Sequence, residues 1–139
     1  MANFSKKSKE KLSTCHIDIQ RVLNESIKEI DFVIICGSRT PEEQFELFKQ
    51  GRVLQGNTWV KTGSTVTNID GKTKKSMHNY SPSLAVDIMP YPIDWNDLGR
   101  IKVLSEVILR KAKELGINLS WGGNWKSFKD YPHYQLEGY

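Results

Sequence analysis

Two histidines and one aspartate have the chemistry and the surroundings of metal ligands. His78 ends a long polar segment, Asp87 lies within an apolar one, and His133 begins another. Two imidazoles and a carboxylate, with a fourth position left to water, are a common way of holding catalytic zinc, which polarises a carbonyl and acidifies the water. Taken alone, residues so far apart are more often ordinary polar side chains than ligands. The third histidine, His16, is expected to be solvated on a polar helical surface.

The elements that must position these residues begin with a helix and a strand. Apolar residues recur at three- and four-residue steps over 12–30, which predicts one helix with a buried face. Residues 32–36 form a β-branched apolar run that Gly37 ends, as in a central strand. The cysteines, Cys15 and Cys36, fall within these two elements and are predicted to be small core residues without a disulfide.

A second helix is predicted over 40–51. Its first residues, Thr-Pro-Glu-Glu, supply a capping hydroxyl, a proline suited to the first turn and two carboxylates that complement the helix dipole. Phe45, Leu47 and Phe48 are then expected to face inward. The polar, glycine-rich stretch 52–75 predicts a long excursion, of the kind that is usually functional or disordered.

The segment 84–88 alternates as a strand does. Leu84, Val86 and Ile88 share one face, so Asp87 is expected to point away from the apolar side. The remaining predicted elements are a helix that begins at Asp94 or Asn96 and ends at Gly116, a strand at 117–121, a turn at Gly122-Gly123 and a strand around 133–136.

This order of elements predicts an α+β domain with helices packed on a small, mostly antiparallel sheet. The chain has 139 residues, of which 38% are hydrophobic and 26% charged, as expected of one ordinary globular domain spanning 1–139. No repeat or second domain is evident.

The net charge of +4 suits either an anionic partner or an ordinary solvated surface. Lys72, Lys74 and Lys75 form the only tight basic cluster, with few aromatic residues between them, so nucleic acid is not an expected partner. No apolar run approaches the ~18 residues of a membrane span, and the first residues lack the apolar stretch of a secretory signal. We therefore expect a chain without a transmembrane segment that is made in the cytosol and does not export itself.

The segments 76–78, 85–87 and 130–133 together resemble the metal motifs of the LAS-type zinc peptidases. These include bacteriophage L-alanyl-D-glutamate endolysins and D-alanyl-D-alanine carboxypeptidases and dipeptidases. Further segments, in matching order, extend the resemblance over residues 30–137: Gly37-Ser38-Arg39-Thr40 with Gln44, 63–67 and 121–125. The implied fold is that of hedgehog-type domains and D-Ala-D-Ala peptidases.

The resemblance implies a role for each motif residue. His78, Asp87 and His133 would bind Zn²⁺, and Asp130 would be the general base that takes the proton of the attacking, metal-activated water. Arg39 would bind a substrate carboxylate or the developing oxyanion.

Each role has a simpler alternative. Asp130, three residues before His133, must lie in the loop before the strand to face the same site, and otherwise is a surface aspartate. Arg39 is alternatively paired with Glu42 or Glu43.

Other side chains are expected to complete the substrate site. Ser76 would hydrogen-bond substrate or orient a ligand. The aromatic residues are expected to wall the cleft, with core packing as the alternative for each: Trp121, Trp125, Tyr80 and Tyr134.

One departure from the family pattern concerns spacing. Many members have Ser-x-His-x-x-Gly-x-Ala-x-Asp, whereas residues 79–83 place His78 two residues farther from Asp87 and contain no glycine. The additional residues fall in a Ser-Pro-Ser turn, which is expected to bulge outward without moving either ligand.

The expected function is that of a phage-type endolysin: a zinc endopeptidase that cuts the L-Ala-D-Glu bond of the peptidoglycan stem peptide. It would be a monomer, made in the host cytoplasm and acting on the cell wall after release. The alternatives are a D-Ala-D-Ala carboxypeptidase or dipeptidase and a non-catalytic binding module that retains the zinc fold. A pure binding module needs neither Asp130 nor Arg39.

Overall fold

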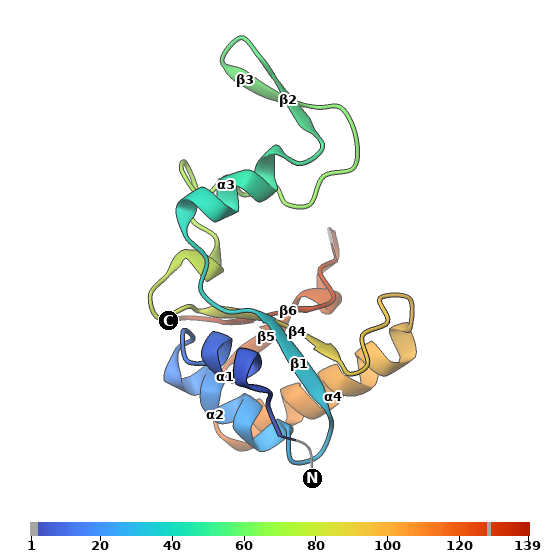
Figure 1. The fold of residues 1–139 in the computed structure, drawn as a ribbon. Coiled ribbons are helices and arrows are strands. Elements are labelled where there is room, and N and C mark those ends of the chain that lie inside the picture. Colours follow the sequence, from blue (N-terminus) through green and yellow to red (C-terminus); the bar gives the residue numbers. More distant parts are fainter. Residues whose placement is uncertain (1–2, 128) are drawn as a thin grey trace.

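A four-stranded antiparallel sheet carries two of the three candidate ligands, Asp87 and His133. The computed structural model describes residues 3–127 and 129–139. The strand order in the sheet is β1-β4-β6-β5, and each neighbouring pair is antiparallel (Figure 1). The elements in the described residues are α1 (Lys6–Leu12), α2 (Ile17–Ser26), β1 (Phe32–Cys36), α3 (Pro41–Lys49), β2 (Arg52–Gln55), β3 (Thr58–Lys61), the 3-10 helix η1 (Met77–Asn79), β4 (Ala85–Pro90), α4 (Leu98–Glu114), β5 (Leu119–Trp121), the 3-10 helix η2 (Gly122–Asn124) and β6 (His133–Leu136). The expected α+β class is confirmed.

Strand β4 alternates as its sequence predicts. Val86 and Ile88 are fully buried in the core, whereas Asp87 between them is half-buried. Asp87 lies opposite His133 on β6 and opposite Cys36 on β1. Because directly opposed residues of neighbouring antiparallel strands share a face, strand pairing places Asp87 and His133 side by side.

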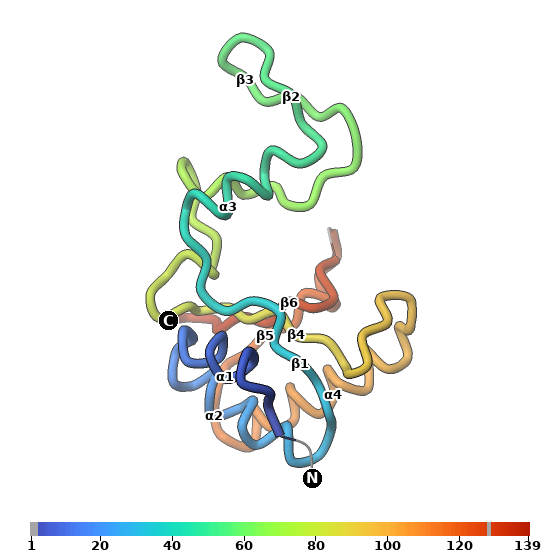
Figure 2. Tube along the Cα trace, in the orientation of Figure 1, coloured from blue at the N-terminus to red at the C-terminus, as the bar shows by residue number. Residues whose placement is uncertain are grey.

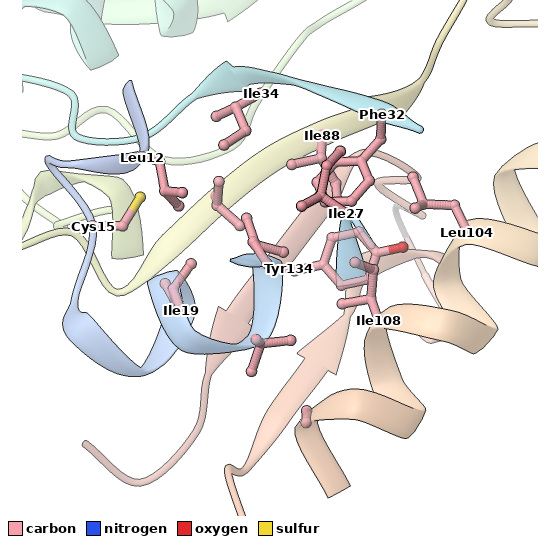
Figure 3. Close-up of a cluster of buried hydrophobic side chains, with 14 of the residues drawn as sticks. Leu12, Cys15, Ile19, Ile27, Phe32, Ile34, Ile88, Leu104, Ile108 and Tyr134 are labelled. Atoms are coloured by element: carbon pink, nitrogen blue, oxygen red, sulfur yellow. The ribbon is translucent and has the colours of Figure 1, made fainter. Parts of the chain in front are cut away.

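Helices α1, α2 and α4 lie together on one side of the sheet, in the lower half of Figure 1. Helix α4 contacts α2, β4 and β5, and α1 contacts β1. Side chains from these helices and from the sheet meet in one apolar core, where Figure 3 shows Ile19, Phe32, Ile108 and Tyr134. Burying a side chain of this size stabilises the fold by about 1.5–3 kcal/mol. The core therefore fixes the sheet from one side and leaves its other face to the polar residues.

The predicted single helix over 12–30 is wrong, because the chain forms α1 and α2 with a break between them. At the break, Cys15 pairs with Ser83 in an isolated β-bridge; the His16 N–H donates to the Ser83 carbonyl, and the Ser83 N–H to the Thr14 carbonyl. His16 is a half-buried cap of α2, its Nδ1 accepting from the Asp18 N–H at 3.0 Å. The apolar spacing runs across the break, so periodicity alone could not reveal it.

Helix α3 begins as predicted but buries a different side chain. The Thr40 hydroxyl accepts from the Glu43 N–H, and the Glu43 carboxylate accepts from the Thr40 N–H, forming a capping box. The buried residue of this helix is Gln44, whereas Phe45, Leu47 and Phe48, expected to face inward, are only partly buried. The helix thus buries an amide, while Phe45 and Phe48 lie against Trp59 and Arg52 of the following hairpin.

The stretch predicted to be an irregular excursion contains a hairpin. Strands β2 and β3 pair antiparallel through a turn in which Gly56 has a positive φ of 61°, a conformation that glycine adopts without strain. In Figure 1 this hairpin and α3 stand on the side of the sheet away from α1, α2 and α4. Figure 2 shows the chain after β3 doubling back past α3 toward the sheet.

Helix α4, with 17 residues, packs its apolar side on the core. Its N-cap is Asp97 rather than the predicted Asp94 or Asn96, and the Asp97 carboxylate accepts from the Arg100 N–H at 3.1 Å. No helix in the described part of the chain is both long and apolar enough to span a membrane.

Gly37, directly after β1, lies against the connection between α1 and α2. A Cβ at this position would lie 2.4 Å from the Lys11 carbonyl oxygen and 2.4 Å from the Thr14 hydroxyl. The Gly37 carbonyl also lies 2.7 Å from Nδ1 of His78. Because Gly37 has no side chain, its backbone can contact both the α1–α2 connection and His78 of the candidate site.

Replacing Gly37 with alanine should destabilise the protein. The added methyl group has no room beside the Lys11 backbone, and overpacking of this kind costs about 1–3 kcal/mol in the free energy of unfolding. Urea denaturation measures the loss. The matched control is Gly63→Ala, because no atom lies within 4 Å of a Cβ there and φ is not positive. Equal unfolding midpoints for the two variants would contradict the packing argument.

Candidate metal site

Three acceptor atoms from separate elements converge at one point. Nε2 of His78, on η1, lies 3.3 Å from Oδ1 of Asp87 and 3.3 Å from Nδ1 of His133. The distance from Nδ1 of His133 to Oδ1 of Asp87 is also 3.3 Å. The structure thus brings together all three residues that the sequence suggests as ligands.

The longer spacing between His78 and Asp87 does not separate them. Ser81 and Pro82 are exposed, so the additional residues do turn outward. Ser83, by contrast, is fully buried, and its hydroxyl donates to the Ala85 carbonyl at 2.7 Å. This anchored end of the turn leads directly into β4.

Hydrogen bonds fix which nitrogen of His78 faces the cluster. The imidazole is almost completely buried, and the Ser76 hydroxyl caps its turn by accepting from the His78 N–H at 3.2 Å. Nδ1 of His78 lies 2.7 Å from the Gly37 carbonyl oxygen, which can only accept. Nδ1 therefore carries the proton of the neutral imidazole, and Nε2 is the nitrogen that faces Asp87 and His133 and could bind a cation.

A relay through three polar side chains orients His133 in the same way. Its Nε2 lies 2.7 Å from Oε1 of Gln135. The Gln135 amide donates through Nε2 to Glu137 at 3.0 Å, and the Ser120 hydroxyl donates to the same Glu137 oxygen at 2.6 Å. Because the Glu137 carboxylate can only accept, the amide must turn its oxygen toward His133. Nδ1 of His133 is then left unprotonated toward the cluster.

These three acceptors fit a small divalent cation. Tetrahedral zinc with nitrogen and oxygen ligands at about 2.0–2.1 Å separates its ligand atoms by about 3.3–3.4 Å, which agrees with the observed triangle of 3.3 Å sides. Partners that hold the outer N–H of each ligating imidazole are typical of metal sites. The geometry and the protonation pattern together describe a site built for a positive charge.

The pKa shifts of His78 and Asp87 also indicate that the cluster favours positive charge. Burial alone would lower the pKa of His78, but hydrogen bonds with Asp87 and Cys36, with the charge of Asp87, raise it to about 9. Burial alone would raise the pKa of Asp87, yet hydrogen bonds with His133 and His78 hold it well below its usual range. The pocket thus stabilises positive charge next to Asp87, which a second proton on His78 supplies in the metal-free protein and which a bound cation would replace.

Cys36 offers an alternative third ligand. Ligand atoms of Cys36, His78 and Asp87 all lie within 4.8 Å of one another. The cysteine is half-buried beside the cluster rather than deep in the core as expected, and both Cys15 and Cys36 are free. Its sulfur lies 4.0 Å from His78 Nδ1, the nitrogen that already faces Gly37. The set with His133 is tighter and uses the available lone pairs.

Asp130 lies beside the cluster, in the loop before β6 as the sequence analysis required. Its Oδ2 is 3.9 Å from Nδ1 of His133. Burial, together with the negative charge of Asp87, raises the pKa of the Asp130 carboxyl. Gly122 allows the loop to approach, because its carbonyl accepts the Asp130 N–H at 3.1 Å and a Cβ there would meet the Asp130 carbonyl. A carboxylate of raised pKa next to a metal site is suited to proton transfer.

Arg39 joins the cluster instead of pairing with the glutamates of α3. Its Nη2 lies 3.6 Å from Oδ2 of Asp87 and 3.4 Å from the Cys36 sulfur, and its Nη1 donates to Oε1 of Gln44 at 2.7 Å. Among the described residues, neither Glu42 nor Glu43 forms an ion pair with it. Gln44 in turn donates to the Ile69 carbonyl at 2.8 Å, which ties Arg39 to the loop after β3.

A cleft of about 630 Å³ opens over these residues. Its lining includes Arg39 and Ser76 together with the three candidate ligands and Asp130. The other lining residues are Gln44, Leu47, Val66, Thr67, Asn68, Ile69, Lys74, Lys75, Met77, Trp125, Ser127, Pro132 and Gln135.

Three aromatic residues expected to wall the cleft lie elsewhere, among them Tyr134, which is buried in the core. Trp121 is buried, stacks on Tyr134 and donates its indole N–H to the Tyr131 carbonyl at 2.7 Å, so it supports the loop that carries Asp130. Tyr80 is partly exposed beneath the ammonium group of Lys75. Of the aromatic residues proposed for the wall, Trp125 is the one that lines the cleft, with its ring 5.3 Å from that of His133.

No sequence motif indicated a role for Gln135. Strand periodicity could have indicated one, since His133 and Gln135 are two residues apart on β6 and share a face. Lys74 and Lys75 were noted only as a basic cluster, and their position on the cleft wall depends on the path of the 62–75 segment.

Comparison with known proteins shows which protein family the chain resembles. A family model described as phage L-alanyl-D-glutamate peptidase matches residues 1–138. The L-alanyl-D-glutamate peptidase of Escherichia phage T5 is 29% identical over 133 residues, covering 92% of this chain and 85% of the phage protein. The resemblance seen in the motifs is thereby confirmed.

Two bacterial proteins are also similar. Peptidoglycan L-alanyl-D-glutamate endopeptidase CwlK of Bacillus subtilis (strain 168) is 40% identical over 111 residues, which cover 78% of this chain but only 62% of CwlK. The crystal structure of the L-Ala D-Glu endopeptidase ChiX of Serratia marcescens matches with a TM-score of 0.71 at 27% identity, covering 96% of this chain and 88% of ChiX.

Replacing Gln135 with leucine should weaken metal binding without unfolding the protein. The variant removes the acceptor that orients His133, and loss of such a partner typically lowers metal affinity about 10–100-fold. Competition for Zn²⁺ with a chromophoric chelator measures the affinity, and thermal unfolding of the metal-free protein checks the fold. Gln55→Leu, at an exposed position of the β2–β3 hairpin, is the matched control. An unchanged zinc affinity in the Gln135 variant would refute the relay.

Proposed function

Since the chain belongs to the phage L-alanyl-D-glutamate peptidase family, we propose that it is a zinc-dependent endopeptidase that hydrolyses the L-Ala-D-Glu bond of the peptidoglycan stem peptide. The observation that carries this proposal is the triangle of acceptor atoms from His78, Asp87 and His133, with sides of 3.3 Å, beside a carboxylate outside the triangle. A zinc ion bound there would polarise the scissile carbonyl and acidify water.

Asp130 is proposed as the general base and acid. Hydrolysis of an amide requires that the attacking water lose a proton and that the leaving amine gain one. The half-buried Asp130 carboxylate lies 3.9 Å from His133, close enough to serve the same reaction centre without displacing a ligand. Its raised pKa makes the Asp130 carboxylate a stronger base toward the attacking water and keeps the proton on the carboxyl group until the amine leaves.

Arg39 is proposed to stabilise negative charge on the substrate. Its guanidinium lines the cleft and is held between Asp87 and Gln44, so its orientation is set before substrate binds. A guanidinium keeps its charge at any working pH and presents several donors. A donor fixed in advance near the developing oxyanion lowers the barrier because it needs no reorganisation during the reaction.

Two other functions are less well supported. The three relatives named above are L-alanyl-D-glutamate peptidases rather than D-Ala-D-Ala carboxypeptidases. A binding module without catalysis would have no use for Asp130 at the edge of the metal triangle. Since one relative is a peptidase of a phage, we further propose that the protein is made in the host cytoplasm and acts on the cell wall after release, as a monomer.

Digestion of purified peptidoglycan tests the reaction, and Asp130→Asn tests the base. The protein loaded with zinc should release fragments with new N-terminal D-Glu and C-terminal L-Ala, identified by mass spectrometry.

The Asp130→Asn variant should keep the parent's zinc affinity but lose about 100-fold or more in kcat/KM, because the carboxamide accepts no proton.

The control is Asp31→Asn, an exposed aspartate ahead of β1, which should digest walls like the parent. Release of free D-Ala would instead support the carboxypeptidase. Undiminished digestion by the Asp130 variant would overturn the assignment of the base.

A further inference from the structure

The lining of the cleft contains both acidic and basic side chains. Its two acidic residues are Asp87, a candidate ligand, and Asp130 beside it. Lys74 and Lys75 line the cleft as well, and within the described residues neither forms an ion pair with a carboxylate. Two exposed lysines on the lining of the cleft, neither paired with a carboxylate, favour a ligand that brings its own negative charge.

The loop that carries these lysines is firmly built. Oδ1 of Asp70 accepts the N–H groups of Lys72 at 2.9 Å, Thr73 at 2.8 Å and Lys74 at 3.2 Å, and its Oδ2 accepts the Thr73 hydroxyl at 2.6 Å. The hydrogen bond from the Thr73 hydroxyl, with those from the backbone, lowers the pKa of Asp70 to about 2. The Asp70 carboxylate therefore keeps its charge at any pH where the enzyme would act.

The loop is also fixed to helix α3. Gly71, with a φ of 78°, packs so closely on α3 that a Cβ there would lie 2.8 Å from the Gln44 side chain and 2.9 Å from the Pro41 carbonyl oxygen. Gln44 is the residue that holds Arg39. The backbone that presents Lys74 and Lys75 is thus set in position by the same side chain that sets Arg39.

The three lysines of the cluster do not have the same surroundings. Lys72 is not part of the cleft lining, and its ammonium lies 4.5 Å from the centre of the Phe45 ring. The Lys75 ammonium lies 4.6 Å from the centre of the Tyr80 ring, which orients it without neutralising it. Lys72 therefore provides a charge-matched control from the same loop.

The proposed substrate supplies the missing negative charge. When the amine of D-Glu is acylated by L-Ala, its two carboxyl groups remain, and only one of them can carry the next residue of the chain. The other is left beside the scissile bond, as a carboxylate or as a carboxamide. Arg39, held by Asp87, Gln44 and Cys36, is assigned to the developing oxyanion, so the lysines are the remaining cations of the cleft lining for this carboxylate.

We propose that Lys74 and Lys75 form a subsite for the unlinked carboxylate of the D-Glu residue, so that the enzyme selects stem peptides in which this carboxylate is not amidated. The assignment rests on the proposed function and adds to it the form of the substrate. A charged hydrogen bond lost at such a subsite corresponds to roughly a tenfold change in binding.

Two synthetic peptides test the subsite. Both contain acetyl-L-Ala-D-Glu-L-Lys-D-Ala linked through the side-chain carboxyl of D-Glu; in one the remaining carboxyl is free, and in the other it is a carboxamide. The zinc-loaded protein should cut the free acid with a kcat/KM roughly tenfold higher, mainly through KM, and the preference should shrink as salt is raised. Lys74→Ala/Lys75→Ala should cut both peptides at similar rates, whereas Lys72→Ala should keep the preference.

The outcomes separate this subsite from the proposed function. If the parent cuts both peptides equally, or if the double variant keeps the preference, the subsite is refuted while the peptidase assignment stands. If the zinc-loaded parent cuts neither peptide, the proposed function fails and the subsite fails with it. Zinc affinity of the double variant, measured by chelator competition, verifies that the substitutions leave the metal cluster intact.

Discussion

The antiparallel register between β4 and β6 is the constraint on which the site depends. Pairing Asp87 with His133 puts a carboxylate and an imidazole on the polar face of the sheet, while Val86 and Ile88 on the other face are held in the core. A slip of one residue would exchange the two faces, burying the carboxylate and exposing the apolar side chains. The hydrophobic core thus sets the position of the ligands, and His78 joins them through the Gly37 carbonyl.

Much of the fold could be predicted from local patterns. The alternation in 84–88 predicted the face of Asp87, and the Thr-Pro-Glu-Glu sequence predicted the start of α3. The helix break at 13–16 could not be predicted, because the bonds that cause it come from Ser83, far along the chain. Nor could the burial of Gln44, since an amide is buried only where its partners, here Arg39 and the Ile69 carbonyl, are already in place.

Part of the candidate site could be predicted from the sequence. Residue types and a family resemblance suggested His78, Asp87 and His133, and the structure brings them within hydrogen-bond distance; their assignment as zinc ligands stays a prediction. What the sequence could not supply is the support around them. The roles of Gln135 and of Trp121 depend on which atoms face each other across β5, β6 and the loop between them, and no pattern of types or spacing contains that information.

The relay from His133 through Gln135 and Glu137 ends at Ser120, on the edge strand of the sheet. Charged side chains on an edge strand protect a protein against edge-to-edge association. Adding them here would reach the candidate ligand His133 from the outside, since the edge strand and that imidazole share one chain of polar contacts. Helix α4 is a safer place for such changes, because within the described residues its Arg110 and Lys111 pair with Glu29 and Glu114, away from that chain of contacts.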